Sequence, residues 1–166
     1  MSSLLAFAAH VLLSLAPQDK ENPEFGWWSA HKAGSWVKLR MEAEQGGVKI
    51  LIEATHTLLE ITKDKAVVEQ KTKVTAAGQA QPEETQKEEI PRDASKARDP
   101  IKIDKEGDEE IEVAGKKMKC HWIEGNQKDS KPKFWLNKEI PGSVARAEVT
   151  AGGATMKIAA VSWEKK

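Results

Sequence analysis

Apolar and polar residues alternate with a period of two along much of the chain, which predicts β-strands. The stretch 37–42 alternates strictly, and the pair Gly46-Gly47 predicts a turn into a second, longer strand over 48–61. In that strand the apolar positions change parity after Leu58, which predicts a β-bulge or a new pairing partner. A polar turn then leads to a third predicted strand over 66–74.

The second half of the chain repeats this alternation in shorter runs. Predicted strand segments follow one another at 101–103, 111–113, 117–122, 133–137, 144–150 and 154–164. The last of them also changes parity, between Ile158 and Val161. Long strands with such slips are typical of a strongly curved sheet. We therefore expect a mainly β protein with seven or eight antiparallel strands in one half-barrel-like sheet.

Two segments depart from the strand pattern. Residues 76–100 are rich in Gln, Glu, Lys, Ala and Pro and contain few large apolar residues, so we expect a polar loop or insertion there. Within it, Ile90-Pro91 fits the edge of a sheet, where proline is tolerated. Residues 25–36 fit a short helix or a loop that covers one mouth of the sheet.

The beginning of the chain carries the strongest apolar signal. Leu4 to Ala16 has no charge and ends in Ser14-Leu15-Ala16, which matches the small-x-small cleavage pattern. Its length of about 13 residues is below the roughly 20 needed to cross a bilayer. We interpret residues 1–18 as an export signal, although a positive charge before the apolar run is missing and Pro17 follows the cleavage position. The alternative is a core helix, which should show polar residues at helical period.

Removal of the signal leaves residues 19–166 as one domain without a transmembrane segment. Lys plus Arg and Asp plus Glu each number 26, so the net charge is zero. This balance gives no general reason to expect nucleic acid as a partner. Cys120 is the single cysteine, either buried or free for intermolecular pairing, and we expect burial because free Cys behaves as a small hydrophobe. The predicted location is periplasmic or secreted.

The sequence offers no pattern for catalysis or for metal binding. Cys120 and His121 are adjacent, and adjacent side chains of a strand point to opposite faces, so they cannot easily hold one ion. No serine lies in a Gly-x-Ser-x-Gly turn. His56 lies on an apolar strand face, where a histidine is more often a hydrogen-bonded core residue. We expect no enzymatic activity, no metal and no cofactor.

Candidate ligand-binding residues are large side chains that the pattern places on one face of a strand or over the mouth. The tryptophans of segment 25–36 fit core or cover residues, and a Trp-lined opening would also suit an apolar guest. Met118 and Trp122 lie on the predicted buried face of a hairpin. The candidates for cavity or cover are Trp27, Trp28, Trp36, Ile52, His56, Met118, Trp122 and Trp135.

A lysine-rich stretch lies beside the later aromatic residues. It contains Lys116, Lys117, Lys119, Lys128, Lys131 and Lys133. Basic residues interleaved with aromatic ones can hold single-stranded nucleic acid by stacking, but export and zero net charge oppose that interpretation. Two alternatives stay open: a solvated hairpin face, or contact with an anionic component of the cell envelope.

The stretch Val113-Ala-Gly-Lys-Lys-Met-Lys-Cys-His-Trp122, followed by Phe134-Trp135-Leu136 and Ile140-Pro141-Gly142, resembles a pattern in exported β proteins. It is similar to proteins related to the bacterial lipoprotein carriers of the Lol type, over roughly 113–163 and more loosely over the early hairpins. The resemblance implies an unclosed, highly curved antiparallel sheet around an apolar interior. Carriers of that type shield acyl chains and have no catalytic residues.

Two functions follow from these observations. The first is an exported, non-catalytic protein that binds a hydrophobic or lipid-like ligand in the concavity of the sheet. The second is a structural or interaction protein of the cell envelope that acts through the lysine-rich hairpin or through the Gln/Glu/Lys-rich segment 76–100. A filled interior would favour the second function over the first.

Overall fold

A computed structural model of the protein describes residues 14–15, 21–96 and 100–166. In these residues strands dominate and one short α-helix is present. The elements are β1 (Ser14–Leu15), α2 (Pro23–Ser29), β2 (Trp36–Gln45), β3 (Val48–Ile61), β4 (Lys65–Ala76), β5 (Gln79–Ala80), β6 (Glu84–Pro91), a 3-10 turn (Ala94–Lys96), β7 (Pro100–Val113), β8 (Lys116–Asn126), β9 (Ser130–Leu136), β10 (Val144–Ala151) and β11 (Ala154–Glu164). The predicted export signal lies almost entirely outside the described residues.

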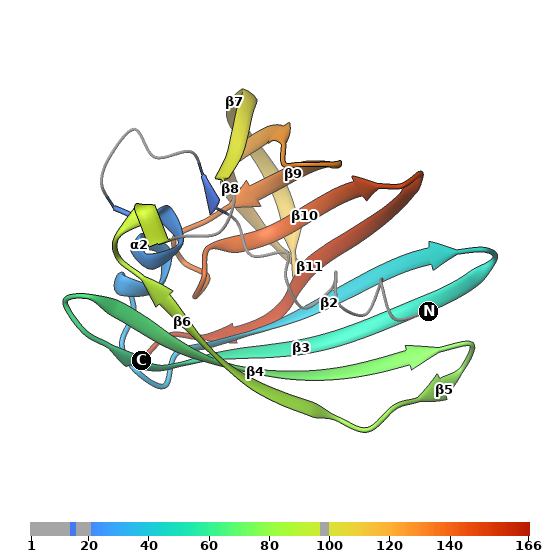
Figure 1. Ribbon diagram of the computed structural model, residues 1–166, viewed down its shortest axis with the longest axis horizontal. Helices are drawn as coiled ribbons and strands as arrows, with labels where there is room; N and C mark the ends of the chain where they lie inside the picture. The colour runs from blue at the N-terminus through green and yellow to red at the C-terminus, as the bar shows by residue number, and fades with distance from the viewer. Residues whose placement is uncertain (1–13, 16–20, 97–99) are drawn as a thin grey trace.

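All strands belong to one sheet, with the order β1-β7-β8-β9-β10-β11-β2-β3-β4-β5, and β6 also pairs with β4. Every pair is antiparallel except β1 with β7. The last strand, β11, pairs with the early strand β2 and so joins the two halves of the chain. The sheet bends strongly and stays open, since its order has two ends (Figure 1). The predicted fold class is confirmed, and it is also the fold that the carrier resemblance implies.

Both parity changes read from the sequence correspond to register shifts. The β3–β4 register shifts between Leu58 and Glu60, and the β11–β2 register shifts between Ala160 and Ser162. The residues skipped at these shifts, Leu59 and Val161, are exposed. Such bulges increase the local twist and bend the strand, which agrees with the strong curvature of the sheet.

Within the segment expected to be a polar loop, the structure instead forms β6. Its eight residues pair with β4 from Lys65↔Pro91 to Thr72↔Glu84. Most β6 side chains are exposed and only Ile90 is buried. Backbone pairing at a sheet edge needs no apolar alternation, so the sequence pattern gave no strand signal here. The ends of the segment, beyond β6, contain turns, the two-residue β5 and undescribed residues.

Helix α2 lies across one end of the curved sheet (Figure 1). Asn22 caps its N-terminus by accepting a hydrogen bond from the backbone N–H of Glu24 at 3.1 Å, and Pro23 occupies the first turn, where proline is tolerated. The helix buries Phe25 and Trp28 toward the sheet. This agrees with the expected short cover over one mouth.

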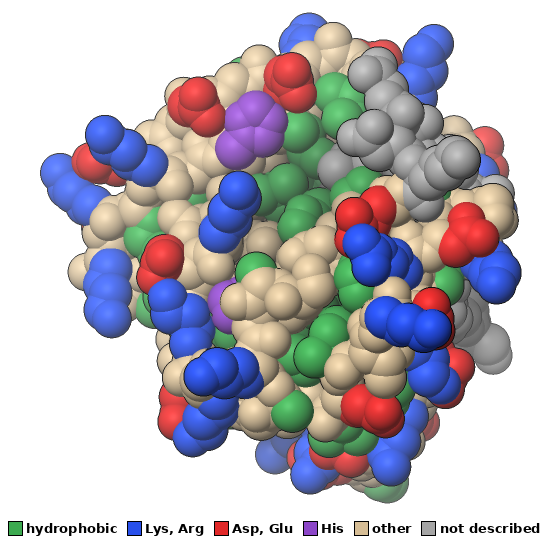
Figure 2. All heavy atoms as spheres, turned by 90° about the vertical axis from the view of Figure 1, so that its left-hand side faces the viewer, with side chains coloured by type: hydrophobic (Ala, Val, Ile, Leu, Met, Phe, Trp, Pro, Cys, Tyr) green, Lys and Arg blue, Asp and Glu red, His purple; other side chains and the backbone are tan. Residues whose placement is uncertain are grey.

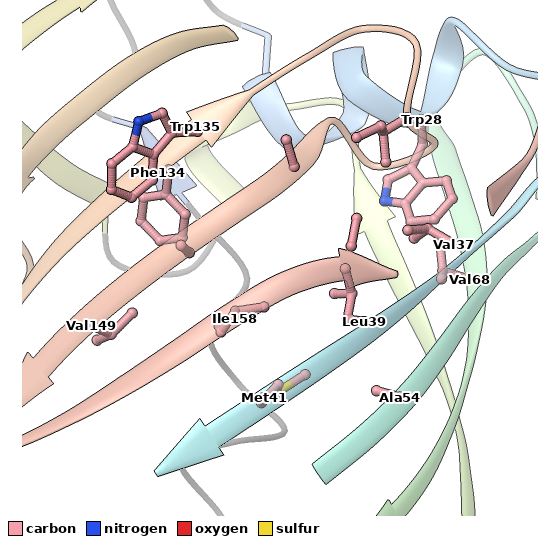
Figure 3. Packing of buried hydrophobic residues seen from close by; sticks show 14 of the residues in the cluster. Trp28, Val37, Leu39, Met41, Ala54, Val68, Phe134, Trp135, Val149 and Ile158 are labelled. Atoms are coloured by element: carbon pink, nitrogen blue, oxygen red, sulfur yellow. The ribbon is translucent and has the colours of Figure 1, made fainter. Parts of the chain in front are cut away.

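The hydrophobic core lies along the concave face. In β3 every second residue from Ile52 to Leu58 is buried, as alternation requires for a strand with one face inward. The buried row continues across neighbouring strands through the pairs Met41↔Ile52 and Met41↔Ile158 (Figure 3). The protein's own side chains therefore fill most of the concave side of the sheet.

Candidate functional site

A small cavity lies between α2 and the concave face of the sheet. Its volume is about 30 Å³, enough for about one water molecule. Seven elements and the loop before β10 contribute to its wall. The lining residues are Glu24, Trp27, Trp28, Val37, Leu39, Met41, His56, Gln70, Phe134, Pro141, Gly142, Val144 and Ile158.

Apolar side chains form most of this wall. Leu39 and Met41 of β2 are 6 % and 4 % exposed, and Ile158 of β11 is 4 % exposed. Phe134 of β9 is 1 % exposed and lies on the same side of the sheet as these residues (Figure 3). The cavity is therefore an apolar space with little access to solvent.

Three polar side chains interrupt the apolar wall. Glu24 comes from α2, whereas His56 and Gln70 lie directly opposite each other on β3 and β4. All three are buried. Gln70 donates a hydrogen bond from Nε2 to Oγ1 of Thr72 at 3.2 Å. Nε2 of His56 has no hydrogen-bond partner among the described residues, which is uncommon for a buried polar atom.

Burial also sets the charge of His56. It lowers the pKa of the imidazole from 6.5 to about 4, because a buried cation loses its hydration. His56 is therefore neutral at pH 7. A neutral imidazole has one nitrogen that donates and one that accepts a hydrogen bond, so the side chain offers the cavity a polar but uncharged contact.

Trp28 closes the cavity on the side of α2. Its indole lies against Gly142 in the loop before β10: a Cβ on residue 142 would sit 2.8 Å from Cζ2 of the ring. Gly142 also has a φ of +74°, a conformation that favours glycine. The loop and the helix therefore fit together only because residue 142 has no side chain.

The N-terminal side of α2 is attached to the end of β6. The backbone N–H of Asn22 donates to the carbonyl of Arg92 at 2.6 Å, and Nδ2 of Asn22 donates to the carbonyl of Pro91 at 2.9 Å. Glu21 and Asp93 form an antiparallel bridge, and the Arg92 side chain pairs with Glu21 at 3.2 Å. This attachment is short: Asn22 is 1 % exposed, whereas the Glu21–Arg92 ion pair lies at the surface.

Of the eight residues proposed from the sequence, Trp27, Trp28 and His56 line the cavity. Ile52 lies in the buried row of β3 but does not line it. The structure does not bring the other four to this site. Trp36 is half-buried at the start of β2 and donates from Nε1 to Oε2 of Glu164 at 3.1 Å. Met118, Trp122 and Trp135 belong to β8 and β9.

Trp122 and Trp135 pack against each other on the face opposite to Phe134. They are directly paired in the β8–β9 register. The Nζ of Lys133 lies 4.6 Å from the ring centroid of Trp122 and 4.7 Å from that of Trp135. Trp135 also donates from Nε1 to Oε2 of Glu109 at 2.9 Å. These contacts make the two tryptophans a packed outer cluster rather than part of the cavity.

The lysine-rich stretch has partners within the protein. Lys117 lies 3.8 Å from the carboxylate of Glu110, and Lys116 lies 5.7 Å from the ring centroid of Trp163. With Lys133 held over Trp122 and Trp135, the hairpin is not a uniformly basic surface. The α2 end of the molecule also shows both signs of charge interspersed with apolar side chains (Figure 2).

Cys120 and His121 have different surroundings, because adjacent side chains of a strand point to opposite faces of the sheet. Cys120 is 1 % exposed, and burial raises the pKa of its thiol. His121 is exposed, with Nδ1 3.1 Å from Asp108 and Nε2 3.5 Å from Glu106. The expected burial of the single cysteine is confirmed.

Sequence reasoning missed several lining residues. Gln70 lies on the same buried face of β4 as Val68. A single polar residue among the buried positions of a strand did not indicate a binding site. Phe134 and Trp135 are adjacent aromatic residues, and only the structure tells which one points inward. Glu24 carried no signal in the sequence except its place at the start of a helix.

A larger hollow of about 510 Å³ lies at the far end of the strands, near the turns between β2 and β3 and between β10 and β11. It is more open and more polar than the cavity under α2. Charged side chains such as Arg40, Glu42 and Lys157 line it, and Arg40 pairs with Glu42 at 2.9 Å. None of the described polar side chains that line it is both buried and without a hydrogen-bond partner. Among these residues the hollow therefore has no polar group positioned to bind a ligand.

No protein-family model matches the chain, and no curated protein matches it. Solved structures to which the chain is similar include a MucB complex and a DUF1329 family protein. In the crystal structure of MucB in complex with MucA(peri), the match has 12 % identity and a TM-score of 0.40, and it covers 86 % of this chain and 56 % of that one. A DUF1329 family protein from Desulfovibrio piger matches with 10 % identity and a TM-score of 0.35, over 86 % and 90 %.

This chain thus spans little more than half the length of the MucB chain. At these TM-scores neither similarity adds to the assignment of fold or function. Among the described residues, no helix is both long and apolar enough to cross a membrane.

Proposed function

We propose that this protein is an exported, non-catalytic binding protein that holds a hydrophobic or lipid-like ligand between α2 and the concave face of its sheet. The observation that carries this proposal is the apolar cavity that contains the unpartnered Nε2 of His56. Ligand sites are mostly apolar and include a few polar groups that orient the ligand. The apolar segment with a small-x-small end before residue 18 supports export.

A ligand larger than water requires α2 to move. Ligand sites usually have volumes of about 300–1,000 Å³, whereas the cavity has about 30 Å³. Helix α2 has only seven residues, and its N-terminal side is attached through the short bridge between Glu21 and Asp93. Displacement of Trp28 together with the helix would open the cavity along Leu39 and Ile158 on the concave face of the sheet. The ligand would then occupy the space that the indole fills.

The first test asks whether the protein carries or binds an apolar molecule. Purified protein is extracted and the extract is analysed by lipid mass spectrometry, and a fluorescent acyl probe is titrated in parallel. We expect a co-purified lipid or saturable probe binding. Absence of both would refute the proposed function.

The second test asks whether α2 must move. Directly opposite residues of an antiparallel pair have Cα atoms about 4.5–5.5 Å apart, which suits a disulfide. The double variant E21C/D93C should therefore lock the start of α2 to the end of β6. The oxidised variant should bind the acyl probe more weakly than the reduced one. T150C/T155C, at a directly opposite pair in the remote β10–β11 hairpin, is the matched control and should bind alike in both states.

The small volume of the cavity favours a second candidate, an interaction protein of the cell envelope. In this alternative the interior is a filled core, and partners bind the exposed lysines of the β7–β8 hairpin. The variant K117E/K119E reverses two exposed charges and leaves Lys133, which packs on tryptophan, unchanged. Loss of a partner in pull-down from envelope extracts, together with no probe binding, would support this candidate. Unchanged partners would oppose it.

A further inference from the structure

His56 is the one side chain in the cavity that combines deep burial with an unpartnered ring nitrogen. It is 5 % exposed, and its Nε2 has no hydrogen-bond partner among the described residues. A polar atom left unsatisfied in the interior costs about 1–3 kcal/mol. A ligand group that hydrogen-bonds to Nε2 would remove this cost, whereas a plain hydrocarbon would leave it in place.

The charges around the cavity select among such groups. The described residues that line it include one carboxyl side chain, Glu24, and no Lys or Arg. Burial also keeps the imidazole of His56 neutral at pH 7. An anionic group would thus be desolvated without a cation to pair with it, which is unfavourable. A neutral hydroxyl, amide or similar group meets no such penalty.

Most of the remaining wall has no hydrogen-bonding side chain. Val37, which lies directly opposite His56 on β2, and Leu39 and Phe134 elsewhere in the wall have no hydrogen-bonding groups in their side chains. Gln70 lies opposite His56 and already donates to Thr72. Two of the three polar side chains of the wall, His56 and Gln70, therefore lie together on β3 and β4, and the third, Glu24, comes from α2.

We infer that the ligand of this cavity is an apolar molecule with a single uncharged hydrogen-bonding group, anchored at Nε2 of His56. This inference rests on the proposed function, because it assumes that the cavity opens to a ligand. It names the class of that ligand more narrowly: an alcohol, phenol or amide with an apolar body, in preference to a pure hydrocarbon or a carboxylate.

Three probes with the same ring system test the inference. Naphthalene, 1-naphthol and 1-naphthoate differ only in the attached group, and their binding to the full chain at pH 7 is measured by equilibrium dialysis. We expect 1-naphthol to bind about tenfold more tightly than naphthalene, which corresponds to about 1.4 kcal/mol. Naphthoate should bind most weakly of the three.

The variant H56F tests the residue itself. It should abolish the preference for 1-naphthol over naphthalene, because the hydrogen-bonding nitrogen is gone and an apolar ring of similar size remains. H121F, at an exposed histidine outside the cavity, is the matched control and should keep the preference. If H56F does not fold, the order of the three probes on the unmodified protein decides alone.

The outcomes separate this inference from the proposed function. If the acyl probe binds, three results would overturn the inference and leave the proposed function standing. These are equal binding of 1-naphthol and naphthalene, tightest binding of naphthoate, or no binding of any naphthalene probe. A preference that survives in a folded H56F would also overturn it. Absence of a co-purified lipid, together with failure of the acyl probe and all three ring probes to bind, would overturn both.

Discussion

The indole of Trp28 in α2 packs directly against Gly142 in the loop before β10. A Cβ added to Gly142 would lie 2.8 Å from Cζ2 and 3.2 Å from Cε2 of the indole, and the glycine has a φ of +74°. Trp28 is 2 % exposed, so the ring has little room to retreat. The fit of Trp28 against this loop therefore requires a glycine at position 142.

The variant G142A should lower the free energy of unfolding by about 2–5 kcal/mol. An L-residue at positive φ costs roughly 1–2 kcal/mol, and overpacking of a core adds about 1–3 kcal/mol. Urea unfolding followed by tryptophan fluorescence measures the change. G78A is the control: Gly78 has a φ of +78° but nothing within 4 Å of the added Cβ, so only the backbone cost should remain. Equal losses in both variants would contradict the packing role of Trp28.

A similar contact holds the outer cluster. The indole of Trp122 lies over Gly107 on the neighbouring strand, with Nε1 2.9 Å from the position of an added Cβ. Gly107 has no positive φ, so the effect of G107A is steric alone, a loss of about 1–3 kcal/mol of stability. A double-mutant cycle with W122L checks this by chemical unfolding. In the W122L background the cost of G107A should fall to nearly zero, and an unchanged cost would contradict the contact.

The alternation that predicted the long strands is a direct result of their burial. β3 has one face toward the core, so polar and apolar residues alternate, and a skipped residue such as Leu59 is visible as a change of parity. The same rule cannot find β6, because nearly all its side chains are exposed and its pairing with β4 uses the backbone. The strand count is higher than expected for this reason and because β1 and β5 have only two residues each.

The site was harder to predict than the sheet. Period-two alternation shows that two residues of a strand share a face, but it does not show which strands meet across the concavity. The sequence therefore identified Trp27, Trp28 and His56 as candidates but could not place Phe134 beside them. Trp135 shows the limit clearly, since adjacent aromatic residues give no parity signal. Its neighbour Phe134 reaches the cavity, while Trp135 is buried on the opposite face of the sheet, under Lys133.

Lys133 should stabilise the outer cluster through its charge. Its ammonium lies within 5 Å of two indole centroids, and cation–π contacts contribute about 0.5–2 kcal/mol. K133M keeps most of the aliphatic stem and should lower the free energy of unfolding by about 1 kcal/mol, whereas K133R should lower it less. K131M, at an exposed lysine on the same strand, should change stability by less than about 0.5 kcal/mol. A K133M variant as stable as K131M would exclude a stabilising role for the charge.

Burial of His56 should make the protein less stable in weak acid. Burial lowers the pKa of His56 in the folded protein from its usual 6.5 to about 4, so between these pH values the unfolded chain binds the proton and the folded protein does not. Stability therefore falls as pH decreases from about 6.5 toward 4, and it does not depend on this group above about 7. The full effect of such a shift is about 3 kcal/mol.

The variant H56Q removes the titrating group and keeps a polar side chain, so its unfolding free energy should depend less on pH than that of the unmodified protein. Urea unfolding at pH 4.5, 5.5, 6.5 and 7.5 gives the difference between the two proteins. Burial lowers the pKa of His31 as well, so His31 also makes the protein less stable as the pH falls. The variant H31Q is the comparison: it removes only the contribution of His31 and should keep that of His56. If H56Q and the unmodified protein lose stability in parallel below pH 6.5, the imidazole is not held neutral by the cavity. In that case charging His56 would have no cost, and water would have to reach Nε2 in the folded state.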